Sequence, residues 1–198
     1  MKRLLWIASL AIAALVLTGG PALASATTLQ SFASSSGANV VIGSDGTSAT
    51  ITLDPCTAPT GCKPYPNFGG VFINSKSLSG KSLSEVVVSF VSTGDVAGGA
   101  PRFSLPIDTD GIGSTNNGYA FLDAAGCGAT VGTNNTISTT VTTSSLDCHV
   151  NFNSVADYPN WKAFAAANPT YRIGPGFIPF IIADGTAGTY TVNSIALR

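Results

Sequence analysis

Charged residues are scarce in this 198-residue chain, at 10% of the total, with 9 Lys and Arg, 10 Asp and Glu and one His. Such a low cation content and a formal net charge of −1 argue against nucleic-acid binding, because neutralising phosphates requires a basic stripe. The single Glu, Glu85, excludes long amphipathic helices, whose solvent-facing sides need many Glu, Lys and Arg side chains. A surface built from Ser, Thr, Asn and Gly is instead typical of extracellular β proteins.

Recognisable catalytic motifs are also missing. The chain has no Gly-x-Ser-x-Gly elbow, no His-Glu-x-x-His motif and no phosphate or dinucleotide loop. Glu85 stands alone, whereas a glycosidase usually needs two carboxylates across a cleft. The sequence therefore does not favour an enzyme; a hydrolase would need two carboxylates, or His149 with a carboxylate, in one pocket.

The N-terminal residues Met1–Ala26 have the pattern of a secretory signal peptide. A basic dipeptide precedes the apolar stretch Leu4–Leu17, which is shorter than the about 20 residues of a membrane-spanning helix. Small residues then predict cleavage after Ala24 or Ala26, with an uncleaved membrane anchor as the alternative. We expect a secreted, extracellular protein in which residues 27–198 form one domain without a membrane span.

If the protein is secreted, its four cysteines are expected to form disulfide bonds, because an even number of cysteines in an oxidising compartment favours pairing. Three pairings are possible. We favour Cys56–Cys62 and Cys127–Cys148, since each closes a short local loop. Zinc binding is the alternative, but the cysteine spacing does not resemble a finger and no pair of histidines accompanies it.

Short strands dominate the hydrophobic pattern. Alternation of apolar and polar residues, or short apolar runs between turn residues, predicts strands at residues 49–53, 71–73, 86–91, 103–107, 119–122, 136–143 and 177–182. The strand 86–91 is apolar on both faces and should be central. Pro179 should place its strand at a sheet edge or at a bulge. In the last strand of the chain, the apolar residues change from one alternating position to the other, which predicts a β-bulge at Asn193-Ser194.

One helix interrupts the strands. Trp161, Phe164 and Ala165 have the i, i+3, i+4 spacing of a helix face, with Asp157 as a cap and Pro159 in the first turn. Pro169 should end it. Because strands and helices do not alternate, a parallel α/β sheet is excluded. The sequence predicts an all-β, antiparallel β-sandwich of jelly-roll type with one short helix and two disulfides.

A candidate calcium site lies in the loop that begins with Asp108, Asp110 and Gly111. Aspartates at alternate positions can converge on one hard cation, as in Asp-x-Asp-Gly calcium loops. Ile112 stands where such loops carry a third ligand, and no Glu closes the loop. The alternative is an Asx turn between two strands.

Aromatic residues are the candidates for ligand binding. The faces of sugars stack on flat rings, and Trp161, Tyr158, Tyr119 and Tyr171 would supply such a platform. Core packing is the alternative for Trp161, given its spacing to the next aromatic residue. Arg102 is notable in a chain with few cations, since it would pair with a turn Asp or bind a ligand carboxylate or hydroxyl.

Residues 98 to 127 contain a succession of motifs, namely Gly98-Gly99-Ala100-Pro101-Arg102-Phe103-Ser104-Leu105, Tyr119-Ala120-Phe121-Leu122 and Cys127. This succession resembles poorly characterised secreted β-sandwich proteins of bacteria, which carry a Gly-Gly-Ser-Pro-Arg-Phe stretch and are similar in build to jelly-roll carbohydrate-binding modules. Ala100 replaces the usual Ser. The resemblance implies a fold and at most a binding role, because fold alone does not fix function.

Three functional hypotheses follow. The leading one is non-catalytic binding of a glycan or cell-wall polymer by ring stacking and neutral hydrogen bonds, which should be insensitive to salt. The second is a structural or adhesive extracellular protein with a protein partner, favoured by a large apolar patch on one sheet face. The third is a hydrolase with an unrecognised site.

Overall fold

The computed structural model describes residues 28–34, 37–55, 67–111 and 117–198. In these residues the chain forms two antiparallel sheets of eight and five strands. Sheet A contains, in spatial order, β1 (Thr28–Ala33), β4 (Gly69–Asn74), β12 (Phe180–Ala183), β6 (Arg102–Asp108), β7 (Gly118–Asp123), β9 (Val150–Phe152) and β10 (Ala156–Tyr158), while β11 (Arg172–Ile173) also pairs with β6. Sheet B contains β2 (Ala38–Ile42), β3 (Ala49–Leu53), β13 (Gly188–Leu197), β5 (Val88–Val96) and β8 (Gly132–Thr142).

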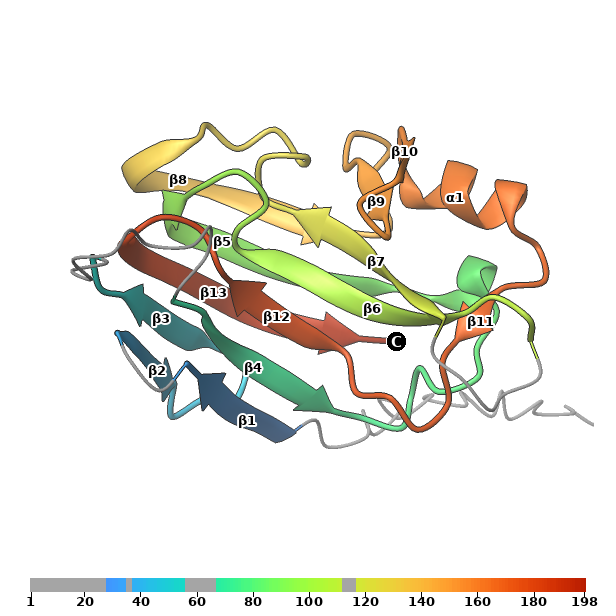
Figure 1. Ribbon diagram of the computed structural model, residues 1–198, viewed down its shortest axis with the longest axis horizontal. Helices are drawn as coiled ribbons and strands as arrows, with labels where there is room; N and C mark the ends of the chain where they lie inside the picture. The colour runs from blue at the N-terminus through green and yellow to red at the C-terminus, as the bar shows by residue number, and fades with distance from the viewer. Residues whose placement is uncertain (1–27, 35–36, 56–66, 112–116) are drawn as a thin grey trace, which may run out of the picture.

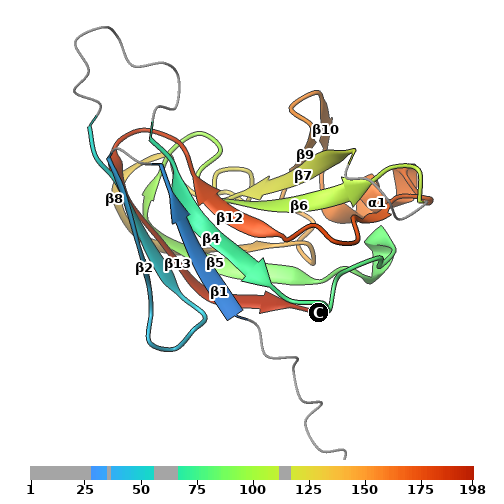
Figure 2. The same ribbon diagram turned by 60° about the horizontal axis from the view of Figure 1, so that its bottom comes forward.

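The two sheets pack face to face, which confirms the all-β, antiparallel two-sheet architecture predicted from the sequence. In Figure 1 β12 and β6 overlie β13 and β5, and Figure 2 separates the layers, with β6, β7 and β12 above β5 and β13. The core lies between them because alternate side chains of each strand point inward. Phe103, Leu105 and Ile107 of β6 and Phe90 of β5 are fully buried there.

Two of the strand predictions are confirmed and one is wrong. Strand β5 lies in the interior of sheet B, between β13 and β8. The register of β13 against β5 shifts between Asn193 and Ala196, with Ser194 at φ +52°. Strand β12, however, lies inside sheet A between β4 and β6. Pro179 permits this because it comes just before the strand, where its carbonyl accepts a hydrogen bond from the backbone N–H of Ile73.

The helix forms where it was expected, but its predicted cap is wrong. Helix α1 (Trp161–Ala167) begins after Asn160, whose side chain accepts a hydrogen bond from the backbone N–H of Ala163 at 2.9 Å. Asp157 lies too early for this role, in β10, and Pro159 precedes the cap. Asn caps a helix as well as Asp does. Asn160 is the cap because it stands directly before the first helical residue. A short 3-10 helix, η1 (Leu83–Glu85), contacts α1 at the same end of the sandwich (Figure 1).

The predicted Cys127–Cys148 disulfide is present, with an S–S distance of 2.09 Å. It joins the segment after β7 to the segment between β8 and β9. Cys56 and Cys62 lie outside the described residues, as does the whole of the predicted signal peptide, Met1–Ala26. Within the described ranges, none of the helices has the length and apolar character that crossing a membrane requires.

Replacing both Cys127 and Cys148 by Ala is expected to lower the free energy of unfolding by about 3 kcal/mol. The reason is that the bond closes a loop with a sequence separation of 21 and so restricts the unfolded chain. Urea denaturation of the oxidised protein and of the variant measures the difference. Equal midpoints would show that this bond does not contribute to stability.

Candidate functional site

A row of aromatic rings crosses the outer face of sheet A, the face turned away from sheet B. Phe32 (β1), Phe72 (β4), Phe180 (β12), and Tyr119 and Phe121 (β7) form this aromatic row. The distances between neighbouring ring centroids are 4.5 Å for Phe32–Phe72, 6.0 Å for Phe72–Phe180, 5.5 Å for Phe180–Tyr119 and 6.2 Å for Tyr119–Phe121. All five side chains are half-buried, so the row presents a nearly continuous apolar surface.

The alternation of each strand places these rings outside. In β7 the inward residues Ala120 and Leu122 are fully buried in the core, so Tyr119 and Phe121 must point the other way. Cross-strand register aligns the remaining rings, because Phe180 stands opposite a phenylalanine of β4. Each pair of neighbouring aromatic rings contributes about 0.5–1.5 kcal/mol of stabilisation beyond that from the burial of surface area.

A polar hollow of about 530 Å³ adjoins one end of the aromatic row. It shares Phe121 with the row, and its other walls come from strands β6, β7, β9 and β10 and from the turn after β12. The residues that matter for its chemistry are Arg102, Phe121, Asp123, Asn151, Asp157 and Asp184. One aromatic ring therefore borders a concave site with both donors and acceptors.

Arg102 is held rigidly at the wall of the hollow. Both terminal nitrogens of its guanidinium donate to the carboxylate of Asp184, and Nη1 also donates to the carbonyl of Gly99 at 3.0 Å. The guanidinium carbon lies 5.1 Å from the centre of the Phe121 ring, within the range of a cation–π contact. Gly99 permits this approach because its φ of +78° closes the turn that ends at Ala100, a conformation that suits glycine.

The other two carboxylates are oriented by the protein but keep acceptor capacity. Oδ1 of Asp123 accepts from the backbone N–H of Gly126 at 2.7 Å, and Oδ1 of Asp157 accepts from the side-chain amide of Asn151 at 2.7 Å. A carboxylate offers about four acceptor positions on its two oxygens. The hollow is therefore suited to hydrogen bonding with several hydroxyl groups of a neutral ligand.

The structure divides the residues predicted to bind a ligand into two groups. Tyr119 and Arg102 lie on the outer face of sheet A, linked through the Phe121 ring. Trp161, Tyr158 and Tyr171 instead surround Phe164, with ring centroids 5.3, 5.0 and 6.3 Å from it. The four predicted rings are thus not brought together on one platform.

Trp161 has the core role that the sequence offered as its alternative. Its side chain is 4% exposed, and Nε1 donates to the carbonyl of Leu83 at 2.7 Å. Its indole is thereby fixed between α1 and η1, with its only hydrogen-bond donor already used.

Sequence reasoning missed the central members of the candidate site, Phe121, Phe180 and Asp184. Phe121 could have been found, because it lies two residues after Tyr119 and so shares its face of a strand. The structure bears out the alternative that Arg102 pairs with a turn Asp, but the sequence could not identify that residue as Asp184, because the two are separated by 82 residues.

The predicted calcium ligands Asp108 and Asp110 lie at the end of β6. The buried carboxylate of Asp108 accepts hydrogen bonds from the backbone N–H groups of Asp110 and Gly111 at 3.1 and 2.8 Å, which is the geometry of an Asx turn. The described parts of the chain contain no group of three His, Cys, Asp or Glu side chains placed to hold a metal ion. Residues 112–116 of the same loop lie outside the described ranges, so calcium binding stays a prediction.

Comparison with known protein families, curated proteins and solved structures finds no match for this chain. The resemblance carried by residues 98 to 127 therefore stays an expectation. Inference about function rests on the geometry of the aromatic row and the polar hollow.

Proposed function

We propose that the protein is a secreted, non-catalytic glycan-binding protein whose site is the aromatic row together with the polar hollow. The observation that carries this proposal is the position of Phe121, which belongs to both. A sugar ring stacked on Phe121 would have its hydroxyl groups within the hollow. The proposal includes the jelly-roll arrangement of strands, which the resemblance carried by residues 98 to 127 implies.

The charges of the hollow favour a neutral glycan. Arg102 is neutralised by Asp184, so Asp123 and Asp157 leave the hollow with negative character, which would repel uronic or other acidic sugars. Binding then depends on stacking and on hydrogen bonds to uncharged hydroxyls. Such contacts are little affected by salt, which mainly screens exposed charges.

Replacing Phe121 by Ala is expected to weaken binding to a retained neutral polysaccharide by at least about tenfold. Burying a Phe side chain contributes about 1.5–3 kcal/mol, and about 1.4 kcal/mol corresponds to tenfold in affinity. The measurement is retention on a panel of insoluble polysaccharides and purified cell walls, followed by a binding isotherm on the best member. The isotherm is repeated at high salt, where the wild-type affinity should not change.

Ile137→Ala is the matched control, because Ile137 is a 77% exposed apolar residue on β8 of the other sheet. It should bind as the wild type does. Failure of the wild type to bind any polymer, or equal affinity of Phe121→Ala and wild type, would contradict the proposal. A strong loss of affinity at high salt would contradict the neutral-glycan mechanism.

An adhesive role with a protein partner is favoured by the β1–β4 end of the same row. Phe68, 40% exposed, extends the row there, with its ring centroid 6.5 Å from that of Phe32. Apolar patches on a sheet face mark interaction sites. Loss of self-association or of partner binding in Phe72→Ala, with polysaccharide retention absent in the wild type, would favour this role.

A hydrolase is favoured by one observation, the presence of Asp123, Asp157 and Asp184 in a single hollow. Two carboxylates in one pocket were the requirement for such an enzyme. His149 is exposed and does not line this hollow. If the protein released soluble reducing sugar from a retained polymer and Asp157→Asn abolished this release, the hydrolase would replace the binding protein as the proposed function.

A further inference from the structure

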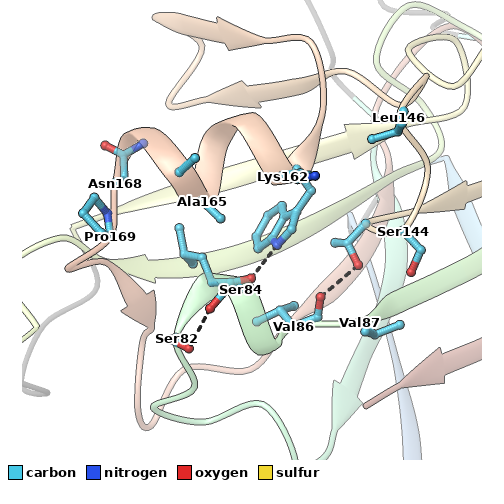
Figure 3. A pocket seen from close by; sticks show the side chains of 14 residues that line it. Ser82, Ser84, Val86, Val87, Ser144, Leu146, Lys162, Ala165, Asn168 and Pro169 are labelled. Carbon is cyan, nitrogen blue, oxygen red and sulfur yellow. Dashed lines mark hydrogen bonds between the residues drawn. The ribbon is translucent and has the colours of Figure 1, made fainter.

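A second, apolar hollow lies between α1 and the start of β5 (Figure 3). Its volume of about 610 Å³ falls within the about 300–1,000 Å³ that small-molecule sites occupy. Three segments distant in sequence build it, namely η1 with the residues that follow it, the segment after β8, and α1. Its main apolar lining residues are Leu83, Val86, Val87, Leu146, Trp161 and Ala165.

Two buried polar side chains in these walls, Trp161 and Thr143, are already paired within the protein. The indole N–H of Trp161 donates to the carbonyl of Leu83. The buried hydroxyl of Thr143 donates to the carbonyl of Val86 at 3.1 Å and accepts from the backbone N–H of Val88 at 3.0 Å. The buried walls therefore present mainly carbon to a ligand, while Ser82, Ser84, Ser144 and Asn168, none of them fully buried, also line the hollow.

Two apolar wall residues are left in contact with solvent. Leu146 is 65% exposed and Val87 is 37% exposed, and they belong to the two segments that face α1 across the hollow (Figure 3). Covering exposed apolar area is favourable by about 25 cal/mol per Å². An apolar ligand would thus gain free energy from walls that are already in place.

Among the described residues that line the hollow, Lys162 is the only charged one. It lies on α1, is exposed, and forms no ion pair with any side chain in the described ranges. A lysine at such a rim lays its aliphatic stem along apolar surface and keeps its ammonium group in water. The hollow thus combines a carbon-lined interior with one cation at its edge.

We propose that this hollow binds a single long-chain alkyl carboxylate, with the alkyl chain against the apolar walls and the carboxylate at the Lys162 ammonium. The charge at the rim distinguishes the ligand from a neutral or cationic amphiphile. This site is separate from the aromatic row and does not depend on the proposed glycan binding.

The test compares three probes of equal chain length, laurate, dodecanol and dodecyltrimethylammonium, each below its micelle concentration. The protein is the full chain carrying Trp6→Phe, in which Trp161 is the single tryptophan and reports directly on its own hollow. Calorimetric titration and the indole emission should show saturable binding in the order laurate, dodecanol, ammonium. Absence of saturable laurate binding, or equal affinity for the three probes, would overturn the proposal.

Two variants separate the parts of the site. Lys162→Met keeps an apolar stem and removes the charge, so laurate affinity should fall about fivefold, the size of an exposed ion pair, while dodecanol affinity stays the same. Ala165→Phe fills the hollow and should reduce the affinity for both probes by more than about tenfold. Ile137→Ala, an exposed aliphatic residue on β8, is the control for non-specific uptake.

Circular dichroism and thermal unfolding establish that both variants are folded before binding is compared. Unchanged laurate affinity in folded Ala165→Phe would place the ligand elsewhere and overturn the proposal. So would binding to anionic phospholipid vesicles without binding of monomeric laurate, because the surface would then be a membrane contact.

Discussion

Replacing Trp161 by Ala is expected to lower the free energy of unfolding by about 3–5 kcal/mol, the usual cost of deleting a buried Trp or Phe side chain. The indole packs edge-on against Phe164 at 5.3 Å and donates a hydrogen bond to the carbonyl of Leu83. It therefore joins α1, a helix of only seven residues, to η1 and the start of β5. Guanidinium unfolding followed by far-ultraviolet circular dichroism measures the loss.

Trp161→Phe separates packing from the hydrogen bond. It keeps an aromatic ring but leaves the Leu83 carbonyl without its donor, so a loss of about 1–2 kcal/mol is expected. Phe177→Ala, which removes an exposed aromatic residue, should stay within about 0.5 kcal/mol of the wild type. If Trp161→Ala kept its stability and instead lost polysaccharide retention, the indole would be the ligand platform rather than a core residue.

Local patterns in the sequence were sufficient for most of the fold. Alternation within residues 49–53 and 103–107 predicted strands β3 and β6, because every second side chain of a strand points to the same face of the sheet and can enter the core. The parity change near Asn193 predicted the β13 bulge for the same reason. Pro179 misled because a strand was assumed to include it; the strand begins one residue later, at Phe180, so no ladder hydrogen bond is lost.

The candidate site was harder to predict because it depends on pairing between strands. A helical spacing to Phe164 marked Trp161 as a core residue as readily as a ligand residue, and the structure shows it in the core. Tyr119 and Arg102 were identified, but only the register of β6 against β7 and the return of the chain to Asp184 bring them to one face. Sequence spacing contains no information about such contacts.

Replacing Asp95 by Ala is expected to lower the free energy of unfolding by about 2–4 kcal/mol, because two hydrogen bonds to a charged acceptor are worth about 1.5–3 kcal/mol each and water can reach part of the gap. The Asp95 side chain is buried on β5. Its two carboxylate oxygens accept from the backbone N–H groups of Asn134 on β8 and Thr189 on β13. One side chain therefore joins β5, an interior strand of sheet B, to both of its neighbours.

The location of this carboxylate explains why it matters. The register of β5 against β8 shifts on both sides of Gly94, whose φ of +88° marks a bulge. Beside this irregularity, the Asp95 carboxylate accepts from one backbone N–H on each neighbouring strand. A side chain therefore adds to the backbone hydrogen bonds that hold the sheet together here.

Asp95→Asn is the informative comparison, measured by urea unfolding beside Asp95→Ala. The amide keeps one acceptor oxygen but turns an NH₂ group toward the second backbone N–H, so it should recover only part of the loss. Full recovery in Asn would show that a single hydrogen bond holds the bulge. An Ala variant as stable as the wild type would show instead that water satisfies both N–H groups, and the carboxylate would then have no part in holding β8 and β13 to β5.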